Sequence, residues 1–414
     1  MHTISPRWTF VALLAWSLAA TATAADTPAR PGPHLPSNPV FTALLTDATT
    51  VTAQIRQLDP RAGVTLAVGD EAERVIPFDR LVKLTREGTP PPIPPDGTLV
   101  LFPEGDRLRG ILGTAGEADL EVNSYVLGEL SIPLEAALAL VLSAPSEPET
   151  LDALVTRLRQ EPRTAEVLWL ANGDRLTGGF LGMSPESIAL QAEAGRVEVA
   201  RAGATALAFD PALVSYPRPE GVYLDLTLAD GSRLGVTDAR LDEGQLRAKA
   251  RFGRPIRLPL TELARIHVRG GSVSYLSERD EAAVQYVNYL GPTRPYRRDA
   301  TVEGHPFLLA GQPYDRGLGT QSRTLLAYKL QGGGRRFQAI VGVDDRAGPL
   351  GNVVFRVLVD GKPCFASPAM SARDTPAAID VDVSGARVLI LMTEFGERGG
   401  VRDVADWVEA RVVR

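Results

Sequence analysis

A short β-hairpin pattern recurs between residues 39 and 270, and it limits the possible folds of this region more than any other sequence feature. Each copy is an apolar run, a turn containing Gly-Asp, Asn-Gly or Asp-Gly, and a second run. The clearest copies are residues 99–110, 167–178 and 224–235. Asn-Gly and Asp-Gly suit the positive φ angles of two-residue hairpin turns. Residues 40–55, with Thr46-Asp47 near their centre, form a degenerate first copy, so we expect four β-units.

The second halves of the copies also agree with one another. An Ile-Pro or Leu-Pro pair follows the hairpin at Ile76-Pro77, Ile132-Pro133 and Leu258-Pro259, whereas the third copy reads Val197-Glu198-Val199. A strand that ends at proline, followed by a short helical turn and a last strand, is typical of a small barrel. We therefore expect SH3-like or Sm-like units of about 45 to 60 residues, packed on their neighbours or folded independently.

Two interruptions divide these units. The units are expected at residues 35–88, 97–145, 163–212 and 220–270. Residues 89–96 are rich in proline and should form an extended linker. Residues 146–162 should form a helical connector, because Ser146 and Glu149 make a capping box. Its apolar stripe consists of Leu151, Leu154, Val155 and Leu158.

The N-terminus has the composition of a targeting segment. Arg7 precedes an apolar run from Trp8 to Ala20, and Ala22-Thr23-Ala24 offers small residues for cleavage. The run is too short to cross a hydrocarbon core of about 30 Å, so we favour a signal peptide at residues 1–25 over a single-pass anchor. We expect a protein without a stable membrane span after cleavage, exported to the periplasm, the cell envelope or the medium.

Composition bounds the partners and the redox chemistry. The net charge of −6 gives no electrostatic argument for nucleic acid, which favours a basic face, so we do not expect that partner. Cys364 is the only cysteine and cannot form an intramolecular disulfide.

The sequence carries no recognisable catalytic motif. The four histidines show no i, i+4 pair, and no HExxH, G-x-S-x-G or P-loop pattern occurs. His267 lies in an alternating run and is expected to face solvent. A glycosidase needs only two carboxylates, so absence of a motif does not exclude that class. A TIM barrel does not fit residues 35–270, which contain one convincing helix, but a β-propeller or β-helix enzyme stays open.

Residues 274–414 have the pattern of a β-sandwich. β-branched or alternating runs occupy residues 336–343, 353–359, 379–383 and 387–392. Asp360-Gly361 should form the hairpin turn after the second run. Strands separated by Gly, Pro and Asp turns, with almost no helix, favour a sandwich.

Four short motifs occur in order along this segment. They are Tyr314-Asp-Arg-Gly-Leu-Gly-Thr320, Val341-Gly-Val-Asp-Asp345, Asp360-Gly-Lys362 and Asp403-Val-Ala-Asp-Trp407. In this order and spacing they resemble the NPCBM family of carbohydrate-binding modules, over roughly Ser274 to Arg414. The resemblance implies a galactose-binding-like β-sandwich of the jelly-roll type. The whole chain is then all-β, with tandem small barrels followed by this sandwich.

The resemblance also suggests roles for individual residues. Trp407 should be buried in the sandwich, with Asp406 fixing nearby backbone N–H groups. The family commonly has His-Ala after the Gly-Leu-Gly-Thr motif, whereas this chain has Gln321-Ser322. Gln321 lacks imidazole chemistry but could still form a bidentate hydrogen bond to two sugar hydroxyls.

Candidate sugar-binding residues combine aromatic platforms with planar polar groups, because sugars present an apolar ring face and hydroxyls. They are Tyr296, Tyr314, Gln321, Asp345 and Arg398, the last in the loop 394–400. Asp344 and Asp345 could together hold a structural Ca²⁺, or they could cap a turn. No other cofactor is expected.

Three functions follow from these patterns. The first is an exported, non-catalytic protein whose C-terminal module binds an envelope or extracellular glycan, with the β-units as a spacer or a protein-binding surface. The second is a structural or protein-binding scaffold without sugar binding. The third is a glycoside hydrolase with an unrecognised catalytic β-domain.

Overall fold

The fold is described from a computed structural model, which describes residues 38–69, 73–88, 98–143, 148–287, 294–330, 333–397 and 399–414. The expected signal peptide, the proline-rich linker, Ser146 of the capping box and Arg398 lie outside the described residues.

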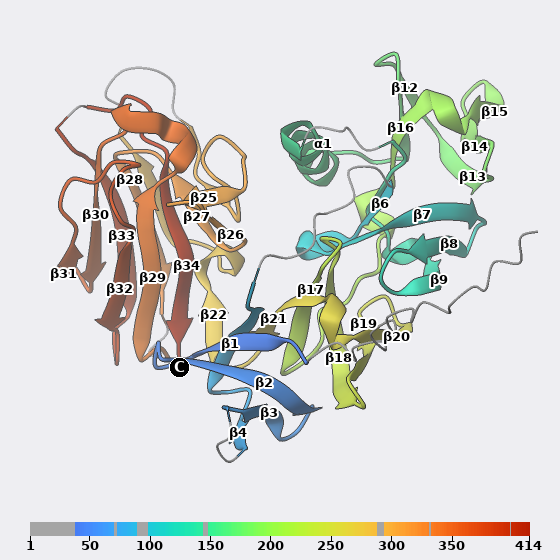
Figure 1. Cartoon of the computed structure of the whole chain (residues 1–414). Helices are drawn as coiled ribbons and strands as arrows, with labels where there is room; N and C mark the ends of the chain where they lie inside the picture. The colour runs from blue at the N-terminus through green and yellow to red at the C-terminus, as the bar shows by residue number, and fades with distance from the viewer. Residues whose placement is uncertain are drawn as a thin grey trace, which may run out of the picture. The chain divides into compact units, whose positions relative to one another are not determined.

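The strands before residue 270 fall into four successive groups in the described part of the chain, here called the four β-units (Figure 1). The first comprises β1 (Val40–Leu45), β2 (Thr50–Asp59), β3 (Gly63–Ala67), β4 (Arg74–Ile76) and β5 (Leu81–Arg86). The second comprises β6 (Thr98–Leu101), β7 (Arg107–Ala115), β8 (Asp119–Ser124), β9 (Gly128–Pro133) and β10 (Ala139–Val141). The third comprises β11 (Val167–Leu170), β12 (Arg175–Thr177), β13 (Gly179–Met183), β14 (Ser187–Ala192), β15 (Gly195–Ala200) and β16 (Ala204–Ala208). The fourth comprises β17 (Tyr223–Leu228), β18 (Arg233–Asp242), β19 (Gln245–Ala250), β20 (Pro255–Pro259) and β21 (Leu263–Arg269).

The four β-units share one pairing pattern. The strands before the last one pair antiparallel in chain order, as β1, β2, β3 and β4 do. The last strand of each unit pairs with the first strand instead, as β5 does with β1 and β21 with β17. In the third unit, β12 and β13 together take the place of one long second strand. The three predicted hairpins are confirmed. The likeness to SH3 or Sm barrels and the domain boundaries stay predictions.

The ends of the units follow the predicted sequence of strand, short helical turn and last strand. β9 ends at Pro133 before the turn η2 (Leu134–Ala136), and β20 ends at Pro259 before η5 (Leu260–Glu262). The third unit makes the same turn, η3 (Arg201–Gly203), without a proline. Proline therefore accompanies this turn but is not required for it.

The last strands join the units in pairs. β5 pairs with β21, which joins the first unit to the fourth, and β10 pairs with β16, which joins the second to the third. One contiguous hydrophobic cluster contains buried side chains from all four units. The repeated units were predicted from the sequence. The pairing of their last strands was not, because the paired strands lie far apart in the chain.

The helix α1 (Pro148–Gln160) covers the seam between β10 and β16. Leu151, Leu154 and Leu158 are buried against Val141 and Ala206 of these strands, and Val155 is partly buried there. The predicted apolar stripe is thus confirmed.

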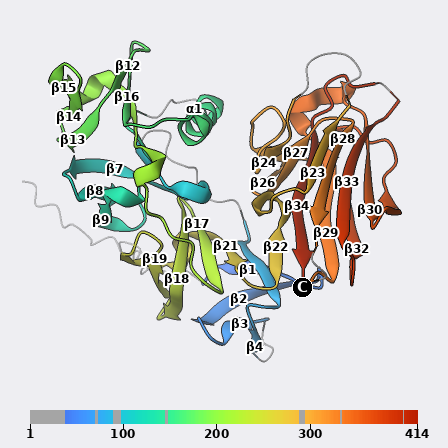
Figure 2. The same cartoon turned by 180° about the vertical axis from the view of Figure 1, so that it is seen from behind.

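The C-terminal region is a sandwich of two antiparallel sheets (Figures 1 and 2). One sheet contains β24 (Arg297–Arg298), β27 (Gly317–Thr320), β34 (Ala405–Val413), β29 (Arg336–Val343) and β32 (Ala377–Asp382), with β22 (Val273–Tyr275) also paired to β34. The other contains β23 (Ala283–Tyr286), β28 (Thr324–Lys329), β33 (Val388–Phe395), β30 (Val353–Val359) and β31 (Lys362–Ala366). A separate hairpin joins β25 (Phe307–Leu309) and β26 (Gln312–Tyr314). The remaining short helical turns are η1 (Pro103–Gly105), η4 (Pro211–Leu213), η6 (Leu276–Glu278) and η7 (Asp345–Leu350).

Trp407 lies in the core between the two sheets, as predicted. Its side chain is fully buried, and its ring meets that of Phe355 edge to face at 5.2 Å between centroids. Its indole Nε1 donates a hydrogen bond of 3.0 Å to Thr393 in the opposite sheet, so the one polar atom of the ring is satisfied. Asp360 and Gly361 both have positive φ angles, 48° and 80°, which confirms the predicted hairpin turn.

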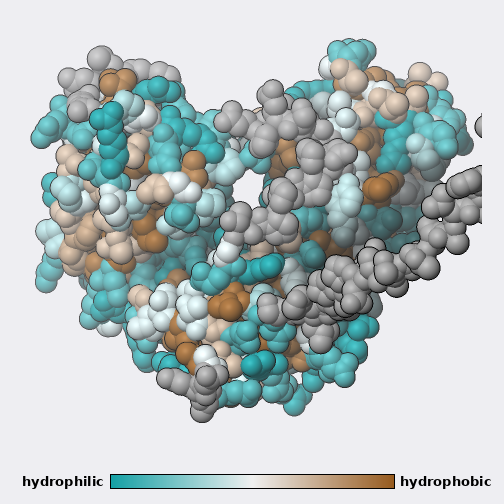
Figure 3. All heavy atoms as spheres, viewed as in Figure 1, coloured by the Kyte–Doolittle hydropathy of each residue, from teal (hydrophilic) through white to brown (hydrophobic). Residues whose placement is uncertain are grey.

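No helix in the described residues is long and apolar enough to cross a membrane. On the face shown in Figure 3, hydrophobic residues lie among hydrophilic ones.

Candidate functional site

The Asp344-Asp345 pair holds the β25–β26 hairpin. Asp344 accepts backbone N–H groups from Leu308 and Arg346, each at 2.9 Å. Asp345 accepts the N–H groups of Ala310 and Gly311 in the hairpin turn, at 2.9 and 2.7 Å. These contacts give both carboxylates a turn-holding role, which was one of the two roles expected from the sequence.

The surroundings of Asp344 and Asp345 do not fit a Ca²⁺ ion. Each of their carboxylate oxygens accepts an N–H group, and the Arg346 guanidinium lies 3.5 Å from Asp344 Oδ1. A cation at these oxygens would meet N–H dipoles and a positive charge. No group of three or more potential metal-ligating side chains occurs among the described residues.

Asp406 does not have its predicted partners. It is fully buried, and neither of its carboxyl oxygens accepts a backbone N–H group from the described residues. Burial raises its pKa well above the usual range, and the neighbouring carboxylate of Asp344 raises it further. The prediction that Asp406 fixes backbone N–H groups is wrong. Asp344 binds backbone N–H groups instead, and it lies beside the carboxyl group of Asp406, which keeps its proton.

The other predicted site residues do not converge. Tyr314 is half-buried in the β25–β26 hairpin, where it packs against a small cluster containing Phe307 and Val408. Gln321 is half-buried and follows β27. Arg398 lies outside the described residues. Tyr296, another of the five predicted site residues, lines a hollow.

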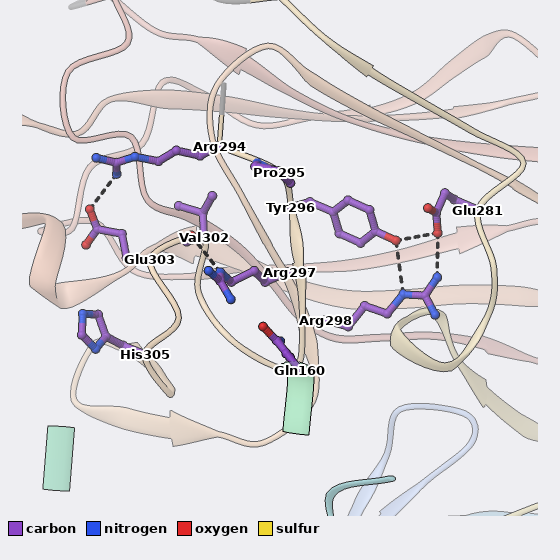
Figure 4. Close-up of a pocket in the computed structure, with 10 residues that line it drawn as sticks. All are labelled: Gln160, Glu281, Arg294, Pro295, Tyr296, Arg297, Arg298, Val302, Glu303 and His305. Carbon is purple, nitrogen blue, oxygen red and sulfur yellow. Dashed lines mark hydrogen bonds and ion pairs between the residues drawn. The ribbon is translucent and has the colours of Figure 1, made fainter. Parts of the chain in front are cut away.

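This hollow, here called the β24 hollow, lies beside β24 and the loop that follows it (Figure 4). Its volume is about 940 Å³. It is lined by Gln160, Glu281, Arg294, Pro295, Tyr296, Arg297, Arg298, Val302, Glu303 and His305. Most of these side chains are polar or charged, and Gln160 is the last residue of α1.

One wall of the β24 hollow is a hydrogen-bonded triad of Glu281, Tyr296 and Arg298. The Tyr296 hydroxyl donates to Glu281 at 2.5 Å and accepts from Arg298 Nε at 3.2 Å, while Arg298 Nη2 lies 2.7 Å from Glu281. Burial raises the pKa of Tyr296 to about 12, and the bond to Glu281 raises it too. Burial opposes ionisation of Glu281, but the bonds from Tyr296 and Arg298 outweigh it and lower the pKa of this carboxyl. At neutral pH Glu281 is therefore ionised, while Tyr296 keeps the proton that it donates to Glu281.

The opposite wall carries Arg294, Glu303 and His305. Arg294 forms an ion pair of 2.8 Å with Glu303. His305 closes a tight turn, since its backbone N–H donates to Thr301 Oγ1 at 3.1 Å and its carbonyl accepts from the Thr301 N–H at 2.8 Å. Figure 4 shows the guanidinium of Arg297 between this wall and the triad.

Two residues of the first C-terminal motif hold the sandwich on the β-units. Asp315 pairs with Arg233, at 2.9 Å, and with Arg265. Arg316 is buried and pairs with Asp225 at 3.0 Å. We call these five residues the ionic joint. Sequence analysis placed Asp315 and Arg316 in a family motif but gave no signal of their partners.

A second group of charges lies beside this joint. Glu409 is buried and pairs with Lys83 at 3.0 Å and with Arg411 at 3.1 Å. His267 is also buried, so the prediction that it faces solvent is wrong. Burial lowers its pKa well below the usual range, and Lys83 lowers it further. The alternation that suggested exposure fails because β21 is covered on both faces.

Comparison with known proteins places the C-terminal third in a family. Residues 273–413 match the family described as the NPCBM/NEW2 domain. This stretch begins at β22 and ends in β34, so it contains the whole sandwich. It also contains every residue that lines the β24 hollow except Gln160.

A curated relative matches part of the chain. It is a protein of Renibacterium salmoninarum named as an endo-alpha-N-acetylgalactosaminidase, 29% identical over 109 residues. The match covers 26% of this chain and 7% of the relative.

Solved structures that are similar to part of this chain include a CBM51 module from Clostridium perfringens GH95 in complex with methyl-galactose. It is 24% identical, with a TM-score of 0.31, and covers 34% of this chain and 99% of that one. A CBM51-2 structure in complex with GlcNAc, from Clostridium perfringens ZmpB, is 19% identical with a TM-score of 0.32. It covers 43% of this chain and 40% of that chain.

Proposed function

Because residues 273–413 are an NPCBM-type carbohydrate-binding module, we propose that this protein binds a glycan through the β24 hollow of its C-terminal sandwich. The glycan would be an envelope or extracellular polysaccharide. The observation that carries the proposal is the coincidence of this family match with a hollow of about 940 Å³ that is lined by planar polar side chains.

The chemistry of the β24 hollow suits a sugar. Guanidinium, carboxylate and amide groups are planar, and they form paired hydrogen bonds with neighbouring hydroxyls. The ring of Tyr296 is held by its hydroxyl and by packing against the sandwich core, which limits the entropy lost on binding. Tyr314, Gln321, Asp345 and Arg398 stay proposals as contacts to a longer glycan.

The rest of the chain would serve this binding module. We propose that residues 35–88, 97–145, 163–212 and 220–270 form a spacer or a protein-binding surface. Residues 1–25 would direct export to the periplasm, the envelope or the medium. No catalytic role is proposed for the β-units.

Glycan-array binding of the purified full chain tests the proposal. The isolated segment 274–414 is a poor substitute, because removing the β-units would expose Arg316 and Glu409, which are buried and paired across the boundary. Wild type should bind at least one glycan class, and Glu281→Gln should weaken it by releasing Tyr296 and Arg298. Asp380→Asn, at an exposed pair with Arg336, is the control and should bind as wild type does. Absence of binding to every glycan would contradict the proposal.

The ionic joint favours a second candidate function, a structural scaffold without sugar binding. Asp315 and Arg316 of the family motif contact the β-units, so these two motif residues are explained without a ligand. If the protein is a scaffold, it should bind no glycan on the array. It should instead bind a partner protein, and wild type and Glu281→Gln should capture that partner equally well. Release of sugars from any polysaccharide by the purified chain would instead support a glycoside hydrolase.

A further inference from the structure

We propose that the β24 hollow selects saccharides that carry a carboxylate, such as uronic or sialic acid residues, through the guanidinium of Arg297. This inference rests on the proposed function and names its ligand class. The observations that support it are the pairing of the charges in the hollow and the position of Arg297.

The carboxylates that line the hollow are already engaged. Glu281 accepts from Tyr296 and Arg298, and Glu303 pairs with Arg294 at 2.8 Å. The neighbouring Asp280 also lies 3.3 Å from Arg298. Neutral sugars are commonly held by acceptors for their hydroxyl protons, and here the strongest acceptors are occupied.

Arg297 is the guanidinium without such a partner. Its Nε donates to the carbonyl of Val302 at 3.3 Å. Among the described residues, neither of its terminal nitrogens has a carboxylate or carbonyl acceptor. Figure 4 shows these nitrogens between the triad and His305. The lining thus has three arginines and two carboxylates, and its unpaired charge is that of Arg297.

The turn after β24 holds this guanidinium in place. Gly304 has a φ of +94°, and a methyl group added there would lie 3.7 Å from Cζ of Arg297, in van der Waals contact. The turn is closed by the Gly304 N–H, which donates to the Thr301 carbonyl at 2.8 Å. The backbone therefore supports Arg297, while Val302 orients its Nε.

A guanidinium held in this way presents two parallel N–H donors, which match the two oxygens of a carboxylate. Asp152 of α1 interacts with His305, but its strongest electrostatic partner is Arg107.

A matched array tests the inference on the full chain. Each uronate- or sialate-bearing oligosaccharide is paired with its methyl ester and with an O-sulfated neutral analogue. Wild type should bind the carboxylate roughly 10- to 100-fold more tightly than the ester, as expected for a bidentate charged hydrogen bond. The preference should weaken as salt is raised. In Arg297→Gln the ratio should approach one, and in Arg297→Lys it should be intermediate.

The control is Arg336→Gln, which removes an exposed arginine of the same sandwich paired with Asp380. It should keep the wild-type ratio, and thermal unfolding of each variant shows whether it is folded. Equal binding of acid and ester by wild type would overturn the inference and leave sugar binding standing. A preference for the sulfated member would overturn the carboxylate assignment. Binding of none of the glycans would overturn the proposed function, and this inference with it.

Discussion

Buried charges in this protein are held by neighbours that are distant in sequence. Asp344 and Asp406 lie side by side in the sandwich, and burial with like charge raises the pKa of Asp406. Asp225 meets Arg316 across the joint at 3.0 Å. Sequence reasoning found Asp344, Asp345 and Trp407 through their motif. It missed Glu281, Arg297 and Arg298, because their meeting depends on how β23 and β24 close one edge of the sandwich.

Replacing Asp344 should cost more stability than replacing Asp406. Asp344→Asn loses one of two acceptors for the Leu308 and Arg346 N–H groups, which should cost about 1 to 3 kcal/mol at pH 7. Asp406→Asn replaces a protonated carboxyl with a neutral amide and should change stability less. Urea unfolding of both variants measures this, and a larger loss in Asp406→Asn would contradict the account.

The same pair predicts a pH dependence. The folded pKa of Asp406 is raised above its unfolded value of about 3.9, so its favourable contribution is complete below that value. Stability should fall as pH rises from about 4 towards the folded pKa, because the unfolded chain releases this proton first. Asp406→Asn should remove that part of the slope. An unchanged slope in urea unfolding between pH 4 and 7 would show that Asp406 is ionised in the fold.

His267 should make the stability of the fold depend on pH in the opposite direction. Its folded pKa lies well below 6.5, so as pH falls below about 6.5 the unfolded chain binds a proton that the folded chain refuses. The loss approaches about 1.4 kcal/mol per pH unit until the folded pKa is reached. His267→Phe keeps the stacking on Tyr275, at 6.1 Å, and should remove this loss. The difference between the two proteins at pH 7.5, 6 and 5 isolates the effect from other groups.

At the scale of elements, periodicity predicted most of the strands. The runs 336–343 and 353–359 coincide with β29 and β30. The repeated bulges were not predicted, although each unit has one where its second and third strands pair, as between Thr237 and Arg240. A bulge depends on pairing across the sheet and leaves little trace in hydrophobic alternation. The helix α1 was predicted because its apolar stripe is complete within the helix.

Truncation of that stripe should destabilise the chain. Leu158 is fully buried between α1 and the β10–β16 seam, so Leu158→Ala should cost about 2 to 5 kcal/mol. Arg157→Ala, at the exposed neighbouring position, should stay within about 0.5 kcal/mol of wild type. Equal effects in urea unfolding would mean that α1 does not cover the seam.

At the scale of the whole molecule, composition and repeats predicted the division into β-units and a C-terminal sandwich. The ionic joint between them was not predicted, because its partners are separated by many residues, 91 for Asp225 and Arg316. Ion pairs of this kind have no local sequence pattern. The joint explains why Asp315 and Arg316 are charged without requiring a ligand.

Removing one charge of the joint should weaken the attachment of the sandwich. Asp315→Asn leaves Arg233 and Arg265 without their carboxylate, and these side chains are only 16% and 21% exposed. The loss should be about 1 to 3 kcal/mol, below that of a fully buried pair. Asp380→Asn breaks an exposed pair and should cost about 0 to 1 kcal/mol. Limited proteolysis near residue 270 should be faster in Asp315→Asn, and equal rates in both variants would contradict the joint.

The central claim is that the C-terminal sandwich binds a glycan in the β24 hollow. The most direct test is a crystal structure of the full chain with a carboxylate-bearing oligosaccharide selected on the matched array. The account predicts sugar density beside Tyr296, with the carboxylate on the terminal nitrogens of Arg297. Density only at the β25–β26 hairpin, beside Gln321 or on the β-units would contradict it.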